Sequence, residues 1–148
     1  DFMLNNNYAF SFTSYNRINK SGLNLGFVSI KERMVNYSNL LYTNSIGCLT
    51  VILDISLLGG KIYMPLIVKR NDYALWLSIL RRGFVAYGLE KPLANYRQRK
   101  SSLSSNKFQV LKYQWQVYRE YQRFGILKCF YYMLFYAFYG LIKKTDYL

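Results

Sequence analysis

The chain has 148 residues, a net charge of +13 and no histidine. This length is enough for one domain with a moderate core, and the absence of histidine excludes Ser-His-Asp and Cys-His catalysis as well as histidine-based zinc sites. The two cysteines, Cys48 and Cys129, form no Cys-x-x-Cys pair, so their spacing indicates neither metal binding nor redox chemistry.

The positive charge is concentrated in the second part of the chain. Residues 1–60 carry four basic and three acidic side chains, whereas residues 61–148 carry sixteen basic and four acidic ones. A basic surface of this kind fits nucleic acid, anionic lipid or a phosphorylated small molecule. Because the chain begins at Asp1 instead of Met, we expect a processed or truncated chain.

The first sixty residues predict two strands and a short helix. Tyr8–Tyr15 alternates with period two, which is typical of a half-buried strand. Residues 16–36 are polar and predict a long excursion or an irregular hairpin. Ser38 is a candidate cap for a short helix through Thr43. The apolar, β-branched run Ile46–Leu53 predicts a buried strand.

The segment from Asp72 to Arg82 predicts a helix, because its apolar residues recur at i, i+3, i+4 and i+7 (Tyr73, Trp76, Leu77 and Leu80). Asn71 is a candidate N-cap, and Gly83 follows as a stop. Beyond it we expect a short strand over Phe84–Tyr87 and an extended segment over Leu93–Arg97.

Two amphipathic helices are predicted at the C-terminal end, over about Lys107–Arg123 and Ile126–Lys144, separated by Gly125. The second helix has an aliphatic stripe (Ile126, Phe130, Met133, Leu134, Ala137, Phe138, Leu141) and an aromatic opposite side. Its uncharged core, Cys129–Ile142, is shorter than the ~20 apolar residues that a membrane span needs. The helix therefore either packs on the domain or lies in a membrane interface, where sixteen tyrosines are well suited.

Asp72 is the most informative candidate for chemistry. It is the only carboxylate between Asp54 and Glu90, and it lies where a helix is expected to begin. A carboxylate there can accept a proton from a hydroxyl. It can equally stabilise the helix through the macrodipole, by ~0.3–1 kcal/mol.

Arg97, Arg99 and Lys100 form a second candidate group. Such a cluster is either a solvated basic loop or a clamp for phosphates, which match the planar guanidinium group of arginine.

Four stretches in a fixed order carry a resemblance to a known family: Ala9–Tyr15, Ile46–Val51, Arg70–Leu77, and Tyr96-Arg97 leading into Ser101–Lys107. Together they resemble the C-terminal half of a bacterial family 2 glycosyltransferase, of the kind that makes teichuronic acid and other surface polysaccharides. The resemblance implies an α/β fold, a truncated glycosyltransferase A-type mixed sheet with flanking helices. Residues 1–103 would form its acceptor side, and residues 104–148 a pair of C-terminal amphipathic helices.

In that family the acid at the position of Asp72 is the general base of an inverting sugar transfer. The family usually has Glu before it, where this chain has Asn71. The resemblance also implies an N-terminal half that binds the nucleotide-sugar donor and a divalent metal (Mg or Mn). We expect the ligands of that metal to lie outside this chain, and the fragment alone to be inactive.

The resemblance implies roles for further residues and partners. Acceptor binding would involve Gly47, Cys48, Thr50 and Trp76, and donor-phosphate binding Arg97 and Arg99. The acceptor would be a glycan or a lipid-linked sugar. We expect a peripheral protein of the inner face of the plasma membrane, held by anionic lipid and not by nucleic acid. The alternative is a non-catalytic basic-aromatic module that binds anionic membrane or nucleic acid.

Overall fold

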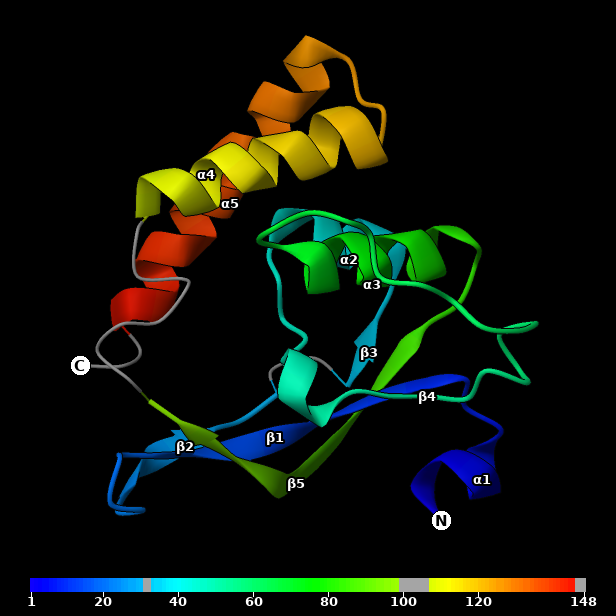
Figure 1. Ribbon diagram of the computed structural model, residues 1–148, viewed down its shortest axis with the longest axis vertical. Coiled ribbons are helices and arrows are strands. Elements are labelled where there is room, and N and C mark those ends of the chain that lie inside the picture. Colours follow the sequence, from blue (N-terminus) through cyan, green and yellow to red (C-terminus); the bar gives the residue numbers. More distant parts are fainter. Residues whose placement is uncertain (31–32, 99–106, 146–148) are drawn as a thin grey trace.

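The computed structural model describes residues 1–30, 33–98 and 107–145. The described chain forms three tiers: a sheet, a middle layer of two helices that covers one face of the sheet, and a pair of C-terminal helices beyond that layer (Figure 1).

The sheet is mixed. Its order is β2-β1-β5-β3, with β4 paired to β1 as well. The strands are β1 (Phe10–Ile18), β2 (Asn24–Val28), β3 (Met34–Val35), β4 (Ile52–Leu53) and β5 (Ala86–Arg97). Only the pairing of β1 with β5 is parallel among the described strands, and the pairings of β1 with β2 and β4 and of β3 with β5 are antiparallel. The predicted α/β class with a mixed sheet and flanking helices is confirmed.

β1 is the central strand, and it is more buried than its alternating pattern predicts. A short helix, α1 (Phe2–Asn6), precedes it. Residues Phe10–Ser14 are all buried, instead of only every second one. Phe10 packs on the helix layer, with its ring centroid 5.2 Å from that of Trp76. The segment that contains β4 lies along the same strand, since Ser11 pairs with Ile52. The hairpin expected over residues 16–36 is confirmed as β1–β2.

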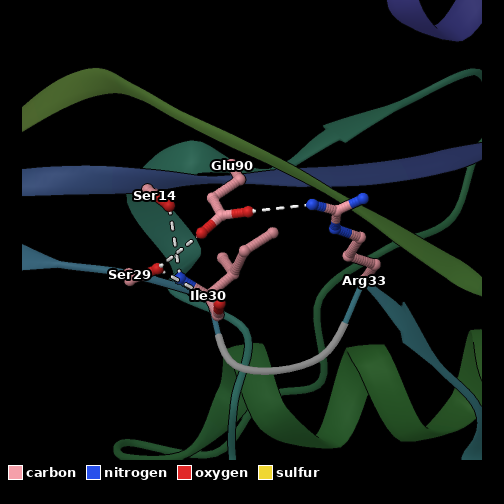
Figure 2. Close-up of polar contacts among 5 residues, drawn as sticks. All are labelled: Ser14, Ser29, Ile30, Arg33 and Glu90. Carbon is pink, nitrogen blue, oxygen red and sulfur yellow. Dashed lines mark hydrogen bonds and ion pairs between the residues drawn. The ribbon is translucent and has the colours of Figure 1, made fainter.

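The connection after β2 is attached to the sheet by side chains (Figure 2). Ser14 of β1 accepts a hydrogen bond from the backbone N–H of Ile30 at 3.2 Å. Glu90 of β5 pairs with Arg33 at 3.1 Å and accepts from Ser29 at 3.5 Å. These contacts hold the connection against both central strands.

The helix expected after Ser38 is α2 (Tyr37–Tyr42), but its cap is Asn36. Asn36 Oδ1 accepts from the Asn39 backbone N–H at 2.9 Å, and Asn39 Oδ1 accepts from the Asn36 N–H at 3.3 Å. This reciprocal pair is a capping box, in which each asparagine side chain satisfies one backbone donor. The predicted cap at Ser38 is therefore wrong.

The strand predicted over Ile46–Leu53 is also wrong. A 3₁₀ helix, η1 (Cys48–Thr50), occupies the middle of the run, and only Ile52–Leu53 pair as β4. The Thr50 side chain and backbone N–H both donate to the Gly47 carbonyl, at 3.0 and 3.1 Å. This local turn competes with the extended conformation that β-branched residues favour.

The helix of the middle layer that was predicted around Asp72 is α3 (Asn71–Arg81). Gly83, with φ +96°, ends the helical turn in a backbone conformation that other residues rarely adopt. The two short extended segments expected after it are one continuous strand, β5.

The C-terminal helices are α4 (Lys107–Gln116), which continues into a π-helical turn, η2 (Val117–Tyr121), and α5 (Ile126–Thr145). We call these elements together the C-terminal hairpin. The aromatic side of α5 faces the domain: the Tyr42 ring of α2 lies edge-on to Tyr132 and Phe135, at 5.2 and 5.3 Å. Among the described residues, no helix combines the length and the apolar character that crossing a bilayer requires.

Candidate site at the start of helix α3

Helix α3 begins abruptly, in a backbone conformation that the sequence does not reveal. Arg70 takes the N-cap position with φ +66°, the left-handed region that few residues other than glycine adopt. Asn71, the predicted cap, is the first helical residue, and its Oδ1 accepts from the Asp72 N–H at 2.9 Å. The turn places Asp72 in the first turn of α3, half-buried.

The Asp72 carboxylate makes one hydrogen bond within the described part of the chain. Its Oδ1 accepts from the Tyr73 backbone N–H at 2.7 Å. An acid in the first helical turn is favoured by the positive end of the helix dipole, so the structure supports the helix-stabilising role. The same position leaves carboxylate lone pairs available to a substrate hydroxyl.

Three other described carboxylates have structural partners. Asp54 accepts from the Ser56 hydroxyl and from two backbone N–H groups, and these bonds lower the pKa of its carboxyl group. Glu90 pairs with Arg33, and Glu120 accepts from the Gln116 amide at 2.8 Å. Asp72 is therefore the better candidate for a proton acceptor.

The 47–50 turn lies within electrostatic reach of Asp72. Burial raises the pKa of the Cys48 thiol, and the negative charge of Asp72 raises it further. Both effects favour the neutral thiol over the thiolate, so these surroundings do not activate Cys48 as a nucleophile. A Cβ atom at Gly47 would lie 3.1 Å from the Tyr15 ring, so the turn lies close against β1, and a side chain at position 47 would require the Tyr15 ring to shift by a few tenths of an ångström.

The other two predicted acceptor residues lie deeper. Thr50 is buried and donates to Gly47 within its own turn. Trp76 is 3% exposed and packs against Phe10, and its indole N–H is buried with no hydrogen-bond partner among the described residues. The structure therefore places Trp76 in the core beneath the start of α3, where its ring does not face solvent.

Arg70 brings a half-buried positive charge beside Asp72. Its guanidinium Nη2 donates to the Tyr136 hydroxyl of α5, and its Cζ lies 5.1 Å from the centroid of the same ring. Burial lowers the pKa of Arg70, and the negative charge of Asp72 raises it. The desolvated cation is stabilised by Asp72 on one side and by an aromatic face on the other.

A buried pair of tyrosines joins the first turn of α3 to the C-terminal hairpin. The Tyr73 hydroxyl donates to the Leu40 carbonyl at 2.9 Å, and the Tyr118 hydroxyl donates to the Leu41 carbonyl at 2.7 Å. The two hydroxyls lie 3.3 Å apart. Burial raises the pKa of Tyr118 to about 12 and the pKa of Tyr73 well above its usual value. Both phenols are neutral. Their hydrogen bonds to α2 hold the first turn of α3 and the C-terminal hairpin in place.

The predicted phosphate clamp is only partly described. Arg97, at the end of β5, is exposed, and its Nη1 donates to the carbonyls of Asn19 and Lys20 at 3.0 and 2.6 Å. These bonds tie β5 to the β1–β2 turn. Arg99, the other predicted phosphate ligand, and Lys100 lie outside the described residues.

The residues present do not fit a metal centre. Within residues 1–30, 33–98 and 107–145 no three histidine, cysteine, aspartate or glutamate side chains gather closely enough to hold an ion.

Sequence reasoning identified Asp72 but missed Arg70 and Tyr136. In the sequence, Arg70 is simply the second of two adjacent basic residues, after Lys69. No sequence pattern indicates that its backbone has a positive φ. The Arg70–Tyr136 contact joins residues 66 positions apart, so no local periodicity indicates it.

Curated relatives of this chain are bacterial glycosyltransferases. Over 128 residues it is 41% identical to the putative teichuronic acid biosynthesis glycosyltransferase TuaG of Bacillus subtilis (strain 168), covering 86% of this chain and 50% of TuaG. Over 144 residues it is 37% identical to the UDP-Glc:alpha-D-GlcNAc-diphosphoundecaprenol beta-1,3-glucosyltransferase WfgD of Escherichia coli, covering 97% of this chain and 55% of WfgD.

A further relative, WfaP of Escherichia coli, carries the same activity in its name and is 35% identical over 147 residues, which are 55% of its length. The chain thus spans about half the length of the curated relatives it matches. No family model and no solved structure matches the chain.

Proposed function

The chain is a homologue of bacterial glycosyltransferases, and from this premise we propose that it supplies the acceptor side of an inverting sugar transfer, with Asp72 as the general base. The donor would be a nucleotide sugar, and the acceptor a surface polysaccharide or a lipid-linked sugar. Assignment to family 2 and to the hexosyltransferases is part of the same proposal.

The observation that carries the proposal is the position of Asp72. Its carboxylate lies half-buried in the first turn of α3 and makes a single hydrogen bond among the described residues. The other described carboxylates discussed above are engaged in caps and pairs. A general base needs a free lone pair within hydrogen-bond reach of the proton that it accepts, and Asp72 meets this condition.

In the proposed reaction, an acceptor hydroxyl binds against Asp72. As its oxygen attacks the anomeric carbon of the donor, the O–H bond breaks and the proton moves to the carboxylate. The bond from the anomeric carbon to the diphosphate oxygen breaks at the same time, and the nucleoside diphosphate leaves with the electron pair. Attack opposite the leaving group inverts the anomeric centre.

The names of two relatives support an inverting transfer to a lipid-linked acceptor. WfgD and WfaP are described as making a β-1,3 linkage from UDP-glucose. The glucose of UDP-glucose is α-linked, so a β-linked product corresponds to inversion. The acceptor in those names, a sugar on diphosphoundecaprenol, supports a lipid-linked acceptor for this chain.

Local surroundings give Asp72 and its neighbours separate roles. The 47–50 turn lies close to Tyr15 of β1, and the proposed acceptor would lie between this turn, with Cys48, and Asp72. Arg70 remains positively charged near the base, both when Asp72 is ionised and after it has accepted the proton. It is a positioning residue, because its guanidinium group is held by Tyr136.

The test is Asp72→Asn in the protein at the full length that its gene encodes, since the relatives are about twice as long as this chain. We expect kcat/KM for transfer from UDP-glucose to fall by roughly 10²–10⁴-fold, the usual contribution of a general base. Binding of the nucleotide sugar, measured by calorimetry, should change little, because the substitution removes only the proton acceptor.

Asp54→Asn is the matched control, since it changes a carboxylate that accepts only structural hydrogen bonds. It should retain transfer. If Asp72→Asn retains transfer and loses only ~0.3–1 kcal/mol of stability, as expected for a helix-dipole role, Asp72 is not the base.

A further inference from the structure

The C-terminal hairpin has a continuous apolar face that no described element covers. It consists of Ile126, Leu127, Phe130, Leu134 and Phe138 on α5 and of Phe108 and Leu111 on α4, and we call it the outer face. Leu127 is 86% exposed, Leu134 71% and Phe108 87%. Exposed apolar surface on this scale marks an interaction site more often than a bare surface.

The spacing of these residues makes the outer face one surface. Ile126, Phe130, Leu134 and Phe138 are four residues apart, which places them on one side of a helix. Trp115 of α4 lies edge-on to Phe130, with ring centroids 5.0 Å apart, so the stripes of the two helices meet. The face is therefore a two-helix surface.

The opposite side of α5 is packed, so the hairpin is held in place. Cys129 is fully buried, and Tyr132 lies against Tyr118 and Phe124, at 5.9 and 5.6 Å between ring centroids. The aromatic side of the helix is thus used to hold the hairpin on the domain, and the aliphatic side is left outward.

The charge of the hairpin indicates the nature of the partner. Residues 107–145 contain seven basic side chains and one acidic side chain, Glu120. Lys112, Arg123 and Lys128 are exposed. Apolar side chains flanked by basic ones match the composition of a bilayer interface with anionic headgroups. A second copy of the same hairpin would bring two positively charged rims together, which is unfavourable.

We propose that the outer face of the C-terminal hairpin docks in the interface of an anionic bilayer, with its apolar side chains among the acyl chains and its lysines and arginines at the headgroups. This binding surface is separate from the proposed chemistry at Asp72, and its test does not require transfer activity. It would also bring the start of α3 close to a membrane, because Tyr136 of α5 contacts Arg70.

Tryptophan fluorescence of the 148-residue chain tests the proposal, because the half-buried Trp115 contacts Phe130 of the outer face, whereas Trp76 lies in the core. The probe is vesicles of phosphatidylcholine with about 30 mol% phosphatidylglycerol, an anionic surface of the kind that attracts basic segments. We expect binding, a blue shift, and quenching of Trp115 by lipids brominated in their acyl chains. Trp115→Phe, which retains only Trp76, should bind without this quenching.

The triple substitution Leu127→Asn, Leu134→Asn and Phe138→Asn should weaken vesicle binding by about tenfold or more, since membrane affinity scales with buried apolar area. Its matched control replaces exposed apolar residues on the sheet side of the molecule: Leu4→Asn, Leu23→Asn and Leu93→Asn, which are 78%, 66% and 65% exposed. This control should bind as the parent does. Circular dichroism checks that both variants keep their helices.

Two results would overturn the proposal. One is vesicle binding that is unchanged by the triple substitution or by omission of phosphatidylglycerol. The other is a concentration-dependent dimer without lipid that the triple substitution abolishes, because a second copy would then be the occupant of the outer face.

Discussion

Helices α3 and α5 are both rich in apolar and aromatic residues, but they bury them differently. Seven of the eleven residues of α3 are buried, because the helix lies between the sheet and the C-terminal hairpin (Figure 1). In α5 the aromatic side packs on α2 and η2, whereas the aliphatic side is exposed. A helix in a middle layer contributes mainly to the core, and a helix in an outer layer keeps one face for a partner.

The largest predicted effect follows directly from this difference. Leu77→Ala in α3 should lower the free energy of unfolding by about 2–5 kcal/mol, because Leu77 is fully buried and its truncation leaves a cavity. Leu134→Ala in α5 removes the same atoms from a side chain that is 71% exposed, so the loss should be within about 0.5 kcal/mol. Urea unfolding of both variants measures the contrast. Equal losses would show that another part of the protein covers α5.

The second prediction concerns Tyr118, on the side of the hairpin that packs against the domain. This side should contribute to the stability of the fold as the core does. Burial raises the pKa of the Tyr118 phenol from 10.0 to about 12. Between these values the folded protein binds more protons than the unfolded chain does, so stability is fully present below pH 10.0 and falls as the pH rises towards 12. The loss should be of the order of 2–3 kcal/mol.

Tyr118→Phe should remove most of the Tyr118 contribution to this alkaline loss, while Tyr73, whose pKa is also raised, retains its own. Denaturant unfolding at several pH values from 8 to about 12 measures both proteins. An identical pH dependence of the two proteins would mean that Tyr118 is solvated and that the hairpin is not docked on α3.

The contrast also explains how far the sequence predicts this structure. Strand β1 and helices α3 and α5 follow from periodicity, since each has a regular apolar pattern over many residues. The 46–53 run does not, because hydrogen bonds from Thr50 to Gly47 form a 3₁₀ turn that β-propensity cannot indicate. For α5, periodicity locates the aliphatic stripe, but only the neighbouring aromatic residues determine that the opposite side is buried.

The residues of the candidate site also differ in how far the sequence predicts them. Asp72 is predictable, because an acid ahead of an aromatic helix is a local pattern. Arg70, Tyr15 and Tyr136 are not, because each enters the site through a contact distant in sequence. Trp76 was predicted at the acceptor from the resemblance, but α3 turns its ring into the core, where it meets Phe10.

The smallest predicted effect tests the contact that joins the two helices. Tyr136→Phe removes the hydroxyl that accepts from Arg70 but keeps the ring beneath the guanidinium group. The desolvated cation then loses one hydrogen bond and keeps its aromatic contact, so the free energy of unfolding should fall by about 1 kcal/mol. Tyr131→Phe is the control, since its hydroxyl only lies 3.5 Å from that of Tyr42 at an exposed position, and it should be nearly neutral. If both variants unfold alike, the Arg70–Tyr136 hydrogen bond does not help to hold the hairpin on α3. The start of α3 would then be independent of whatever binds the outer face of α5.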